Sequence, residues 1–275
     1  MAESDHHIKS LATAFRVVEV LERRGPLGVT DLARETGVAK SSVYKHLDTL
    51  REVGYVSRDD GEYALSYRWF RTGSRVRERN PVYRVAQPEL KRLARRTGET
   101  ASLVVAEDGD AVYLSQVSGA AEPHGPVPEG ERLPALASVG GKALYSYRPF
   151  EAVESLLAAT DRDADVEEVR AELEAVRDQR LVVERDGADP GGFSAGALEG
   201  HRHVTGHDDP YLDLGGAAVP VRTPDDYGVA ALEVTGPAAS LAGRRLDEDV
   251  ASLLVAAGKS VETDLVRAGE SRADA

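Results

Sequence analysis

The sequence predicts an α+β protein of two domains: a small helical domain with a β-hairpin, then a larger antiparallel sheet with helices. Three observations support this class. Helical hydrophobic spacing over residues 8–53 is followed by a hairpin pattern. Strand-like and helical segments alternate over residues 82–266. The charge also changes sign at Asn80–Pro81, because residues 1–80 carry a net charge of +2 and residues 81–275 carry −15. This asymmetry indicates two units with different partners.

Composition excludes several classes of protein. The formal net charge of −13 argues against a protein that coats polyanions, and the absence of cysteine excludes disulfides, thiol nucleophiles and zinc sites that need sulfur. There is no apolar run of about 18 residues and no signal-like segment in residues 1–9, so we expect a cytoplasmic protein with no membrane partner. Lysine is scarce among the basic residues, which is typical of salt-adapted proteins or of a GC-rich genome.

Three amphipathic helices are predicted at the start of the chain. The first covers residues 8–24, and the second is N-capped by Thr30 and ends at Gly37. The third runs from Lys40 to Val53. Its inward positions are Val43, Leu47 and Leu50. Strand-like segments on both sides of Asp59-Asp60-Gly61 then predict a β-hairpin.

Two short helices joined by a glycine-containing turn and followed by a hairpin predict a winged helix-turn-helix. In such a domain the third helix has an apolar inner face and a polar outer face that fits the major groove. The partner is therefore expected to be double-stranded promoter or operator DNA. The candidate contacts are Lys40, Ser41, Ser42, Tyr44, Lys45, His46 and Thr49 on the helix and Arg58 on the hairpin. The alternative is an ordinary solvated helix face.

A basic helix is predicted over residues 67–80, and it contains the only tryptophan of the chain, Trp69. One winged helix makes few contacts with DNA, so we expect two or more copies to act together as a homodimer or homotetramer. The helix is a candidate dimerisation linker, with a plain surface helix as the alternative. The predicted domains are residues 1–66 (DNA binding), 67–80 (linker helix) and 81–275 (effector binding).

The larger domain is predicted to combine antiparallel strands with helices that lie mainly on one face of the sheet. The predicted strands cover residues 101–106, 111–117, 181–183, 214–221 and 229–235. The predicted helices cover residues 82–97, 138–147, 151–159, 166–179 and 246–266.

The whole chain resembles the IclR family of transcriptional regulators. The segments that carry the resemblance are DLARETGVAKSSV at 31–43, LPALASVGGKAL at 133–144, AVPV at 218–221 and ALEVTGP at 231–237. The resemblance implies a winged helix, a linker helix and a GAF-like effector domain in a promoter-binding dimer or tetramer that responds to a small metabolite. It also implies an effector site formed by Ser138, Val139, Gly140, Gly216, Glu233 and Thr235.

Two of these positions depart from the family pattern. The family often has cysteine or another side chain where this sequence has Gly216, and a serine or small residue where it has Glu233. A carboxylate at this place would disfavour an acidic effector unless a cation compensates for its charge.

Two motifs suggest an alternative, a hydrolase or metal-dependent enzyme in the larger domain with a regulatory winged helix. Gly192-Phe193-Ser194-Ala195-Gly196 fits the serine-hydrolase elbow, but loop-forming residues precede it where a strand is required. The cluster of His201, His203, His207, Asp208 and Asp209 has donors suited to a divalent metal, but it reads as a polar loop. We therefore predict neither an enzyme nor a metal or cofactor site, and a winged helix that only mediates protein association is the third possibility.

Overall fold

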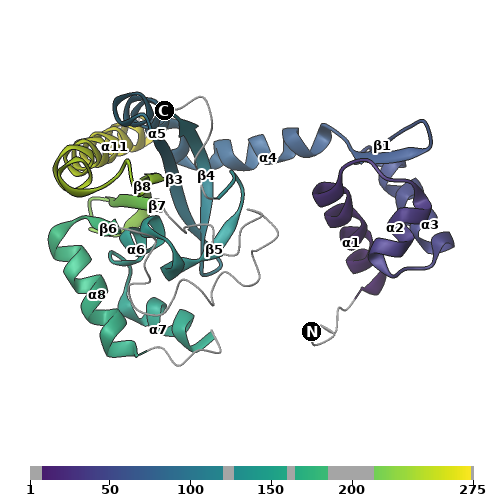
Figure 1. Ribbon diagram of the computed structural model, residues 1–275, viewed down its shortest axis with the longest axis horizontal. Helices are drawn as coiled ribbons and strands as arrows, with labels where there is room; N and C mark the ends of the chain where they lie inside the picture. The colour runs from purple at the N-terminus through teal and green to yellow at the C-terminus, as the bar shows by residue number, and fades with distance from the viewer. Residues whose placement is uncertain (1–7, 120–126, 160–164, 185–213, 274–275) are drawn as a thin grey trace. The chain divides into compact units, whose positions relative to one another are not determined.

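The computed structural model describes residues 8–119, 127–159, 165–184 and 214–273, and the chain divides into two compact units, Met1–Arg79 and Asn80–Ala275 (Figure 1). The first unit contains α1 (Lys9–Arg24), α2 (Val29–Thr36), α3 (Lys40–Glu52), β1 (Val56–Asp59), β2 (Glu62–Leu65) and α4 (Arg68–Arg79). Its core is formed by Val17, Val20, Leu21, Leu32, Val43, Leu47, Val56 and Tyr63. Three helices and an antiparallel hairpin around one small core make a winged helix-turn-helix.

The start of α2 differs from the prediction, which placed the N-cap at Thr30. The helix begins at Val29, and Gly28 is its N-cap. The cause is a bridge between Leu27 and Tyr63, whose backbone groups exchange hydrogen bonds of 2.9 and 3.0 Å. Because this bridge holds Leu27 in an extended conformation, the helix starts directly after it. The same bridge ties the second strand of the hairpin to the helical core.

The second unit is built on a six-stranded sheet, which is antiparallel at every pairing of the described strands and has the order β5-β4-β3-β8-β7-β6. The strands are β3 (Thr100–Glu107), β4 (Asp110–Ser118), β5 (Arg132–Pro134), β6 (Val182–Glu184), β7 (Leu214–Arg222) and β8 (Gly228–Pro237). Strand β5 was not predicted, because Arg-Leu-Pro has no run of β-branched or apolar residues, whereas the equally short β6 overlaps the apolar run Leu181–Val183.

Helices cover both faces of this sheet, which corrects the prediction that they lie mainly on one face. The helices are α5 (Pro81–Thr97), α6 (Val139–Tyr145), α7 (Phe150–Ala159), α8 (Val166–Gln179) and α11 (Ala251–Ala273), with a π-helical turn at Arg245–Val250. Helices α5 and α11 lie on one side of the sheet, and α6, α7 and α8 lie on the other (Figure 1). The prediction failed because β7 and β8 are buried on both faces and carry small apolar side chains instead of a clear apolar–polar alternation.

Candidate DNA interface and effector site

Helix α3 presents two chemically different faces. Val43 and Leu47 are fully buried in the core of the first unit. On the opposite face Lys40, Ser41, Tyr44, Lys45 and Thr49 are exposed, whereas Ser42 and His46 are half-buried. The structure therefore supports an outward polar face at most of these positions. The side chain of His46 is partly covered by the rest of the domain.

The positive charge near α3 is available to a ligand. Arg24 and Arg34 pair with carboxylates of α2, at 3.5 Å from Glu35 and 2.8 Å from Asp31. In contrast, Lys40, Lys45 and Arg58 make no ion pair within the described part of the chain. These three cations can therefore approach phosphates without first breaking a salt bridge.

Arg58 projects from β1 of the hairpin, where it is exposed. Its guanidinium lies over the ring of buried Tyr63, 5.3 Å from the ring centroid. This contact restrains the side chain while leaving its charge free. The hairpin therefore offers one cation beside the polar face of α3.

Helix α4 is anchored to the first unit at its start. The Nε1 of Trp69 donates to the backbone oxygen of Tyr55 at 2.9 Å, and the two rings meet edge to face at 4.7 Å. Arg68 donates to the backbone oxygen of Val53 at 3.1 Å. None of the residues of α4 is buried. Apolar side chains are exposed on α1 and near or on α4: Ile8, Leu11, Phe15, Tyr67, Phe70 and Val76.

The six predicted effector residues are brought together in the second unit by three segments. Ser138, Val139 and Gly140 start α6, and Ser138 caps the helix by accepting a hydrogen bond from the N–H of Gly141 at 3.0 Å. Gly216 on β7 is the register partner of Thr235 on β8. All six residues are buried. The sequence places these segments far apart, and the sheet and α6 make them neighbours.

Glu233 is the charged group of this cluster, and its side chain is completely buried. Its Oε2 accepts a hydrogen bond from the backbone N–H of Gly140 at 2.8 Å, and the hydroxyl of Tyr113 donates to both carboxylate oxygens at 3.2 and 3.3 Å. Burial raises the pKa of Glu233 to about 7, against the lowering effect of these two donors, and the charge of Glu184 adds to the rise.

Both glycines of the cluster lie at close approaches, and the approach is tighter at Gly140 than at Gly216. A Cβ on Gly140 would lie 2.6 Å from the Oε2 of Glu233 and 2.7 Å from the Cγ2 of Val104. A Cβ on Gly216 would lie 3.0 Å from the Cγ2 of Thr235. The backbone of α6 is thus packed directly on the strand that carries the carboxylate.

Several polar residues of the site were not predicted as functional. Ser102 is fully buried on β3 opposite Glu233, and its Oγ accepts from the Nε2 of Gln116 at 3.2 Å. Thr100 on β3 is opposite Thr235, and the Oγ1 atoms of both threonines are buried without a hydrogen-bond partner among the described residues. The sequence signal for such a residue is a polar side chain between apolar neighbours in a predicted strand, as at Ser102 between Ala101 and Leu103.

Lys142 on α6 was also missed as part of this region. Its side chain is 3% exposed, and its Nζ lies 2.8 Å from Glu184 on β6 and 3.1 Å from Glu172 on α8. Burial alone lowers the pKa of Lys142, but the two carboxylates outweigh burial and raise it. The lysine therefore remains charged, and it joins α6 to two other elements.

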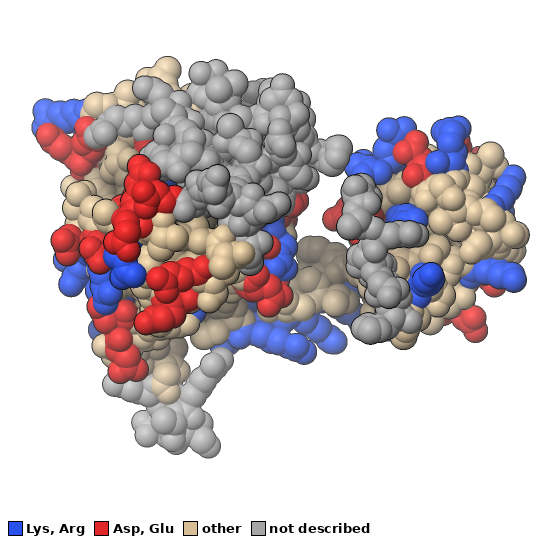
Figure 2. Space-filling view, turned by 90° about the horizontal axis from the view of Figure 1, so that it is seen from below, with Lys and Arg blue, Asp and Glu red and all other residues tan. Residues whose placement is uncertain are grey.

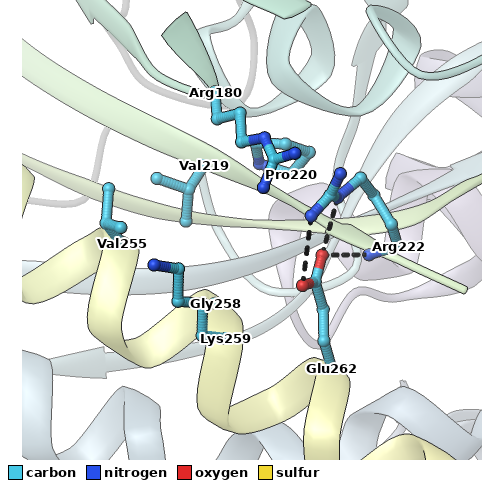
Figure 3. A pocket seen from close by; sticks show the side chains of 8 residues that line it. All are labelled: Arg180, Val219, Pro220, Arg222, Val255, Gly258, Lys259 and Glu262. Carbon is cyan, nitrogen blue, oxygen red and sulfur yellow. Dashed lines mark hydrogen bonds and ion pairs between the residues drawn. The ribbon is translucent and has the colours of Figure 1, made fainter. Parts of the chain in front are cut away.

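Two concave regions lie on the α11 side of the sheet. The pocket of Figure 3 is about 30 Å³, far smaller than a metabolite site. In it Glu262 accepts from the N–H, Nε and Nη2 of Arg222 at 3.0, 2.8 and 3.3 Å, which ties β7 to α11 (Figure 3). A larger groove is lined by Asn80, Pro81, Val82, Arg84, Val85, Arg222, Thr223, Pro224, Val229, Leu265, Val266, Ala268 and Gly269. Neither region contains a predicted effector residue.

The residues of the enzyme alternative, namely Ser194, His201, His203, His207, Asp208 and Asp209, lie outside the described residues. Within the described ranges no group of three or more His, Asp or Glu side chains is placed to hold a metal ion. Across the same ranges no helix has the length and apolar character needed to cross a membrane.

Comparison with known proteins agrees with both units. Residues 10–60 match the IclR helix-turn-helix domain, and residues 75–195 match the bacterial transcriptional regulator IclR C-terminal domain. The HTH-type transcriptional regulator KdgR of Escherichia coli (strain K12) is 25% identical over 256 residues, which cover 92% of this chain and 91% of KdgR.

Solved structures share the fold. The crystal structure of Thermotoga maritima IclR has a TM-score of 0.74 at 20% identity, with 94% of this chain and 99% of that chain covered. An IclR homologue of Microbacterium hydrocarbonoxydans, complexed with 4-hydroxybenzoate, has a TM-score of 0.69 at 23% identity, with 94% and 99% covered. The relatives are DNA-binding transcriptional regulators and not enzymes, so this chain, which carries both family domains in order, belongs to the IclR family of transcriptional regulators.

Proposed function

We propose that this regulator acts in the cytoplasm as a homodimer, or a pair of such dimers, that reads operator DNA with α3 and the hairpin. DNA binding is assigned to residues 1–66, dimerisation to residues 67–80 and effector binding to residues 81–275. The observation that carries the proposal is the two-faced α3, on which Val43 and Leu47 are fully buried while most of the polar side chains are exposed. Such a helix inserts into the major groove and stays attached to its domain.

The DNA contacts fall into two groups by chemistry. Lys40, Lys45 and Arg58, which make no ion pair among the described residues, bring their charges to phosphates. Ser41 and Ser42 lie in the first turn of α3; the N–H of Ser42 already donates to the backbone oxygen of Ala39 at 2.8 Å, so this residue is assigned a contact through its hydroxyl. Tyr44 and Thr49 are exposed on α3 and His46 is half-buried, and these three side chains are assigned to base edges or the sugar–phosphate backbone. Because Thr49 already donates to the backbone oxygen of Lys45 at 3.0 Å, we assign it an accepting role.

Dimerisation is supported by the exposed apolar side chains of α1 and α4. Tyr67 and Phe70 are 93% and 73% exposed, which is costly for residues of their size unless another surface covers them. A second copy of the same helices is the proposed cover. The small positive charge of residues 1–80 points the same way, because each protomer makes few phosphate contacts and two are needed for tight binding.

The buried cluster around Glu233 is the proposed effector site. It joins α6, β3, β7 and β8, so a ligand there contacts the centre of the sheet and the first turn of a helix at once. A ligand that binds this cluster differently in two arrangements of the dimer shifts the balance between them and changes the affinity for DNA. Whether the DNA-bound form represses or activates depends on where the operator lies.

Fluorescence anisotropy on DNA from the region upstream of the protein's own gene tests the DNA-binding part. We expect sequence-selective binding that weakens as salt increases, because phosphate contacts release counterions. Fragments that lack the upstream region serve as the control. Equal affinity for both kinds of fragment would contradict operator recognition, and a 1:1 protomer-to-operator stoichiometry would contradict the dimer.

A further inference from the structure

We propose that Glu233 sets the chemical class of the effector. Its carboxylate already takes the N–H of Gly140 and the hydroxyl of Tyr113, so the effector is an uncharged or cationic molecule that presents hydroxyl or amino groups, and carboxylic acids are disfavoured. This inference rests on the proposed effector site and deepens it.

The two groups that donate to the carboxylate of Glu233 are not available to a ligand. Gly140 N–H and Tyr113 hydroxyl both donate to Glu233, at 2.8 Å and at 3.2–3.3 Å. No ligand atom fits between the carboxylate and α6, because even a Cβ on Gly140 would lie 2.6 Å from the Oε2 of Glu233. A carboxylate ligand would have to displace Glu233 from these donors and leave its charge buried without partners.

Negative charge around Glu233 also disfavours an acidic ligand. Lys142 on α6 is a buried cation of the same unit, and Glu184 and Glu172 already hold its Nζ at 2.8 and 3.1 Å. Glu184 lies close enough to Glu233 to raise its pKa. The region therefore carries three carboxylates against one lysine, and an acidic ligand would add a fourth. An amine or alcohol adds no such repulsion.

Polar side chains on the same face of the sheet as Glu233 are an independent sign of a ligand there. Alternation along β3 directs Thr100 and Ser102 away from the layer that holds Ala101 and Leu103, toward the α6 side. Thr235 lies on that side too. A Cβ added to Gly216 would approach both the Cγ2 of Thr235 and the Cγ2 of Val139, and Val139 belongs to α6.

The hydroxyls of Thr100 and Thr235 are opposite each other in the β3–β8 register, both residues are at least 98% buried, and neither Oγ1 has a partner among the residues described. Buried hydroxyls are normally hydrogen-bonded. Two of them without partners among the described residues, beside a carboxylate, suit a ligand that carries several hydroxyl or amino groups, since such groups donate to Glu233 and can exchange hydrogen bonds with both threonines.

A chemical-rescue experiment on the full-length protein tests whether the carboxylate of Glu233 occupies the place that an acidic ligand would need. Glu233→Ala removes the carboxylate and leaves the two donors free, so sodium formate should raise the thermal midpoint of this variant by about 2–4 °C over equimolar sodium chloride. The wild-type protein and Thr235→Ala, which loses a buried polar group but keeps the carboxylate, should show no formate-specific rise. A Glu233→Ala midpoint that is the same in formate and chloride would overturn the proposal.

A second measurement does not depend on the folding of the alanine variant. The wild-type protein and Glu233→Gln are each titrated with 4-hydroxybenzoate and with 4-hydroxybenzyl alcohol, which differ only in the carboxylate. The ratio of acid affinity to alcohol affinity should rise at least tenfold in Glu233→Gln. Wild-type protein that prefers the acid over the alcohol would refute the proposal.

These readouts separate the inference from the proposed function. Formate rescue reports folding stability and needs neither DNA nor the natural effector. If the wild-type protein fails to bind any operator while rescue succeeds, the proposed regulatory role is wrong and the assignment of Glu233 stands. If operator binding is found and rescue fails, the proposed regulatory role stands and the assignment of Glu233 is wrong.

Discussion

The two units of this protein use polar residues in opposite ways. On α3 most polar side chains are exposed and the cations Lys40 and Lys45 have no ion-pair partner in the described part of the chain. Around Glu233 the polar groups are buried and bound mainly to one another. An exposed group costs the fold little and is free to meet a ligand, whereas a buried group is tied to the stability of its domain. Substitutions should therefore separate binding from stability in the first unit and couple them in the second.

The charge distribution follows the same division. In the face shown in Figure 2, Asp and Glu side chains crowd the C-terminal unit, while Lys and Arg are more prominent over the N-terminal unit. An acidic sensor avoids DNA, so contact with the polyanion is confined to the small unit that carries the recognition helix.

The largest expected effect is on the buried lysine. Lys142→Ala should lower the stability of the second unit by about 3 kcal/mol, because it leaves Glu184 and Glu172 without their cation in a partly buried place. Chemical denaturation with a probe in the second unit measures this loss. Lys259→Ala, an exposed lysine on α11, is the matched control and should change stability by less than about 0.5 kcal/mol. Equal effects of the two substitutions would show that the buried pairing contributes nothing.

The next effect is the pH dependence that Glu233 imposes. Its pKa is about 7 in the folded protein and near 4.5 when unfolded, so the folded state holds the proton more tightly. The stabilising contribution of protonation is complete below the unfolded pKa, and it is lost as pH rises through about 7, a change on the order of 2–3 kcal/mol. Thermal midpoints measured from pH 5 to pH 8 should therefore fall more steeply for the wild-type protein than for Glu233→Gln. Parallel pH profiles would refute the buried titrating carboxylate.

A smaller loss is expected from a single methyl group at the junction of α6 and β8. Gly140→Ala places a Cβ against Glu233 and Val104 and should destabilise the second unit by about 2 kcal/mol. Gly73→Ala is the control, because nothing lies within 4 Å of its added Cβ in α4, and it should stabilise that helix by about 0.5 kcal/mol. Both are read from thermal unfolding of the full chain, and a neutral Gly140→Ala would show that α6 can move away from the strand.

The smallest effects on stability are expected on α3, where binding should change instead. Lys45→Ala should weaken operator binding about tenfold, within the range of about 1–3 kcal/mol for a base or phosphate contact, and leave the thermal midpoint unchanged. His46→Ala should weaken binding similarly and lower stability slightly, because His46 is half-buried. Lys91→Ala on α5 is the control for loss of one exposed positive charge. Affinity that is unaffected in both α3 variants would move the DNA interface elsewhere.

Local features of the sequence were sufficient to predict most elements. Helical spacing gave α1 and α3, and the Asp-Gly turn gave the hairpin; the helix predicted at 138–147 is α6, which begins at Val139 with Ser138 as its N-cap. These features depend on residues within a few positions of each other, so periodicity and capping chemistry reveal them. The predicted cap at Thr30 was wrong because a contact with Tyr63, far along the chain, decides where α2 begins.

The sequence by itself determined the two-unit division of charge, the helices, the hairpin and the polar outer face of α3. Only the tertiary structure decided that helices cover both faces of the sheet, and that Gly140 and Glu233, 93 positions apart, share a hydrogen bond. It also decided that Lys142 pairs with two carboxylates and that two threonine hydroxyls are opposite each other with no partner among the residues that the structure describes. The physical reason is that strand order and helix packing join distant segments, and the protonation and pairing of a buried group depend on those neighbours rather than on adjacent residues.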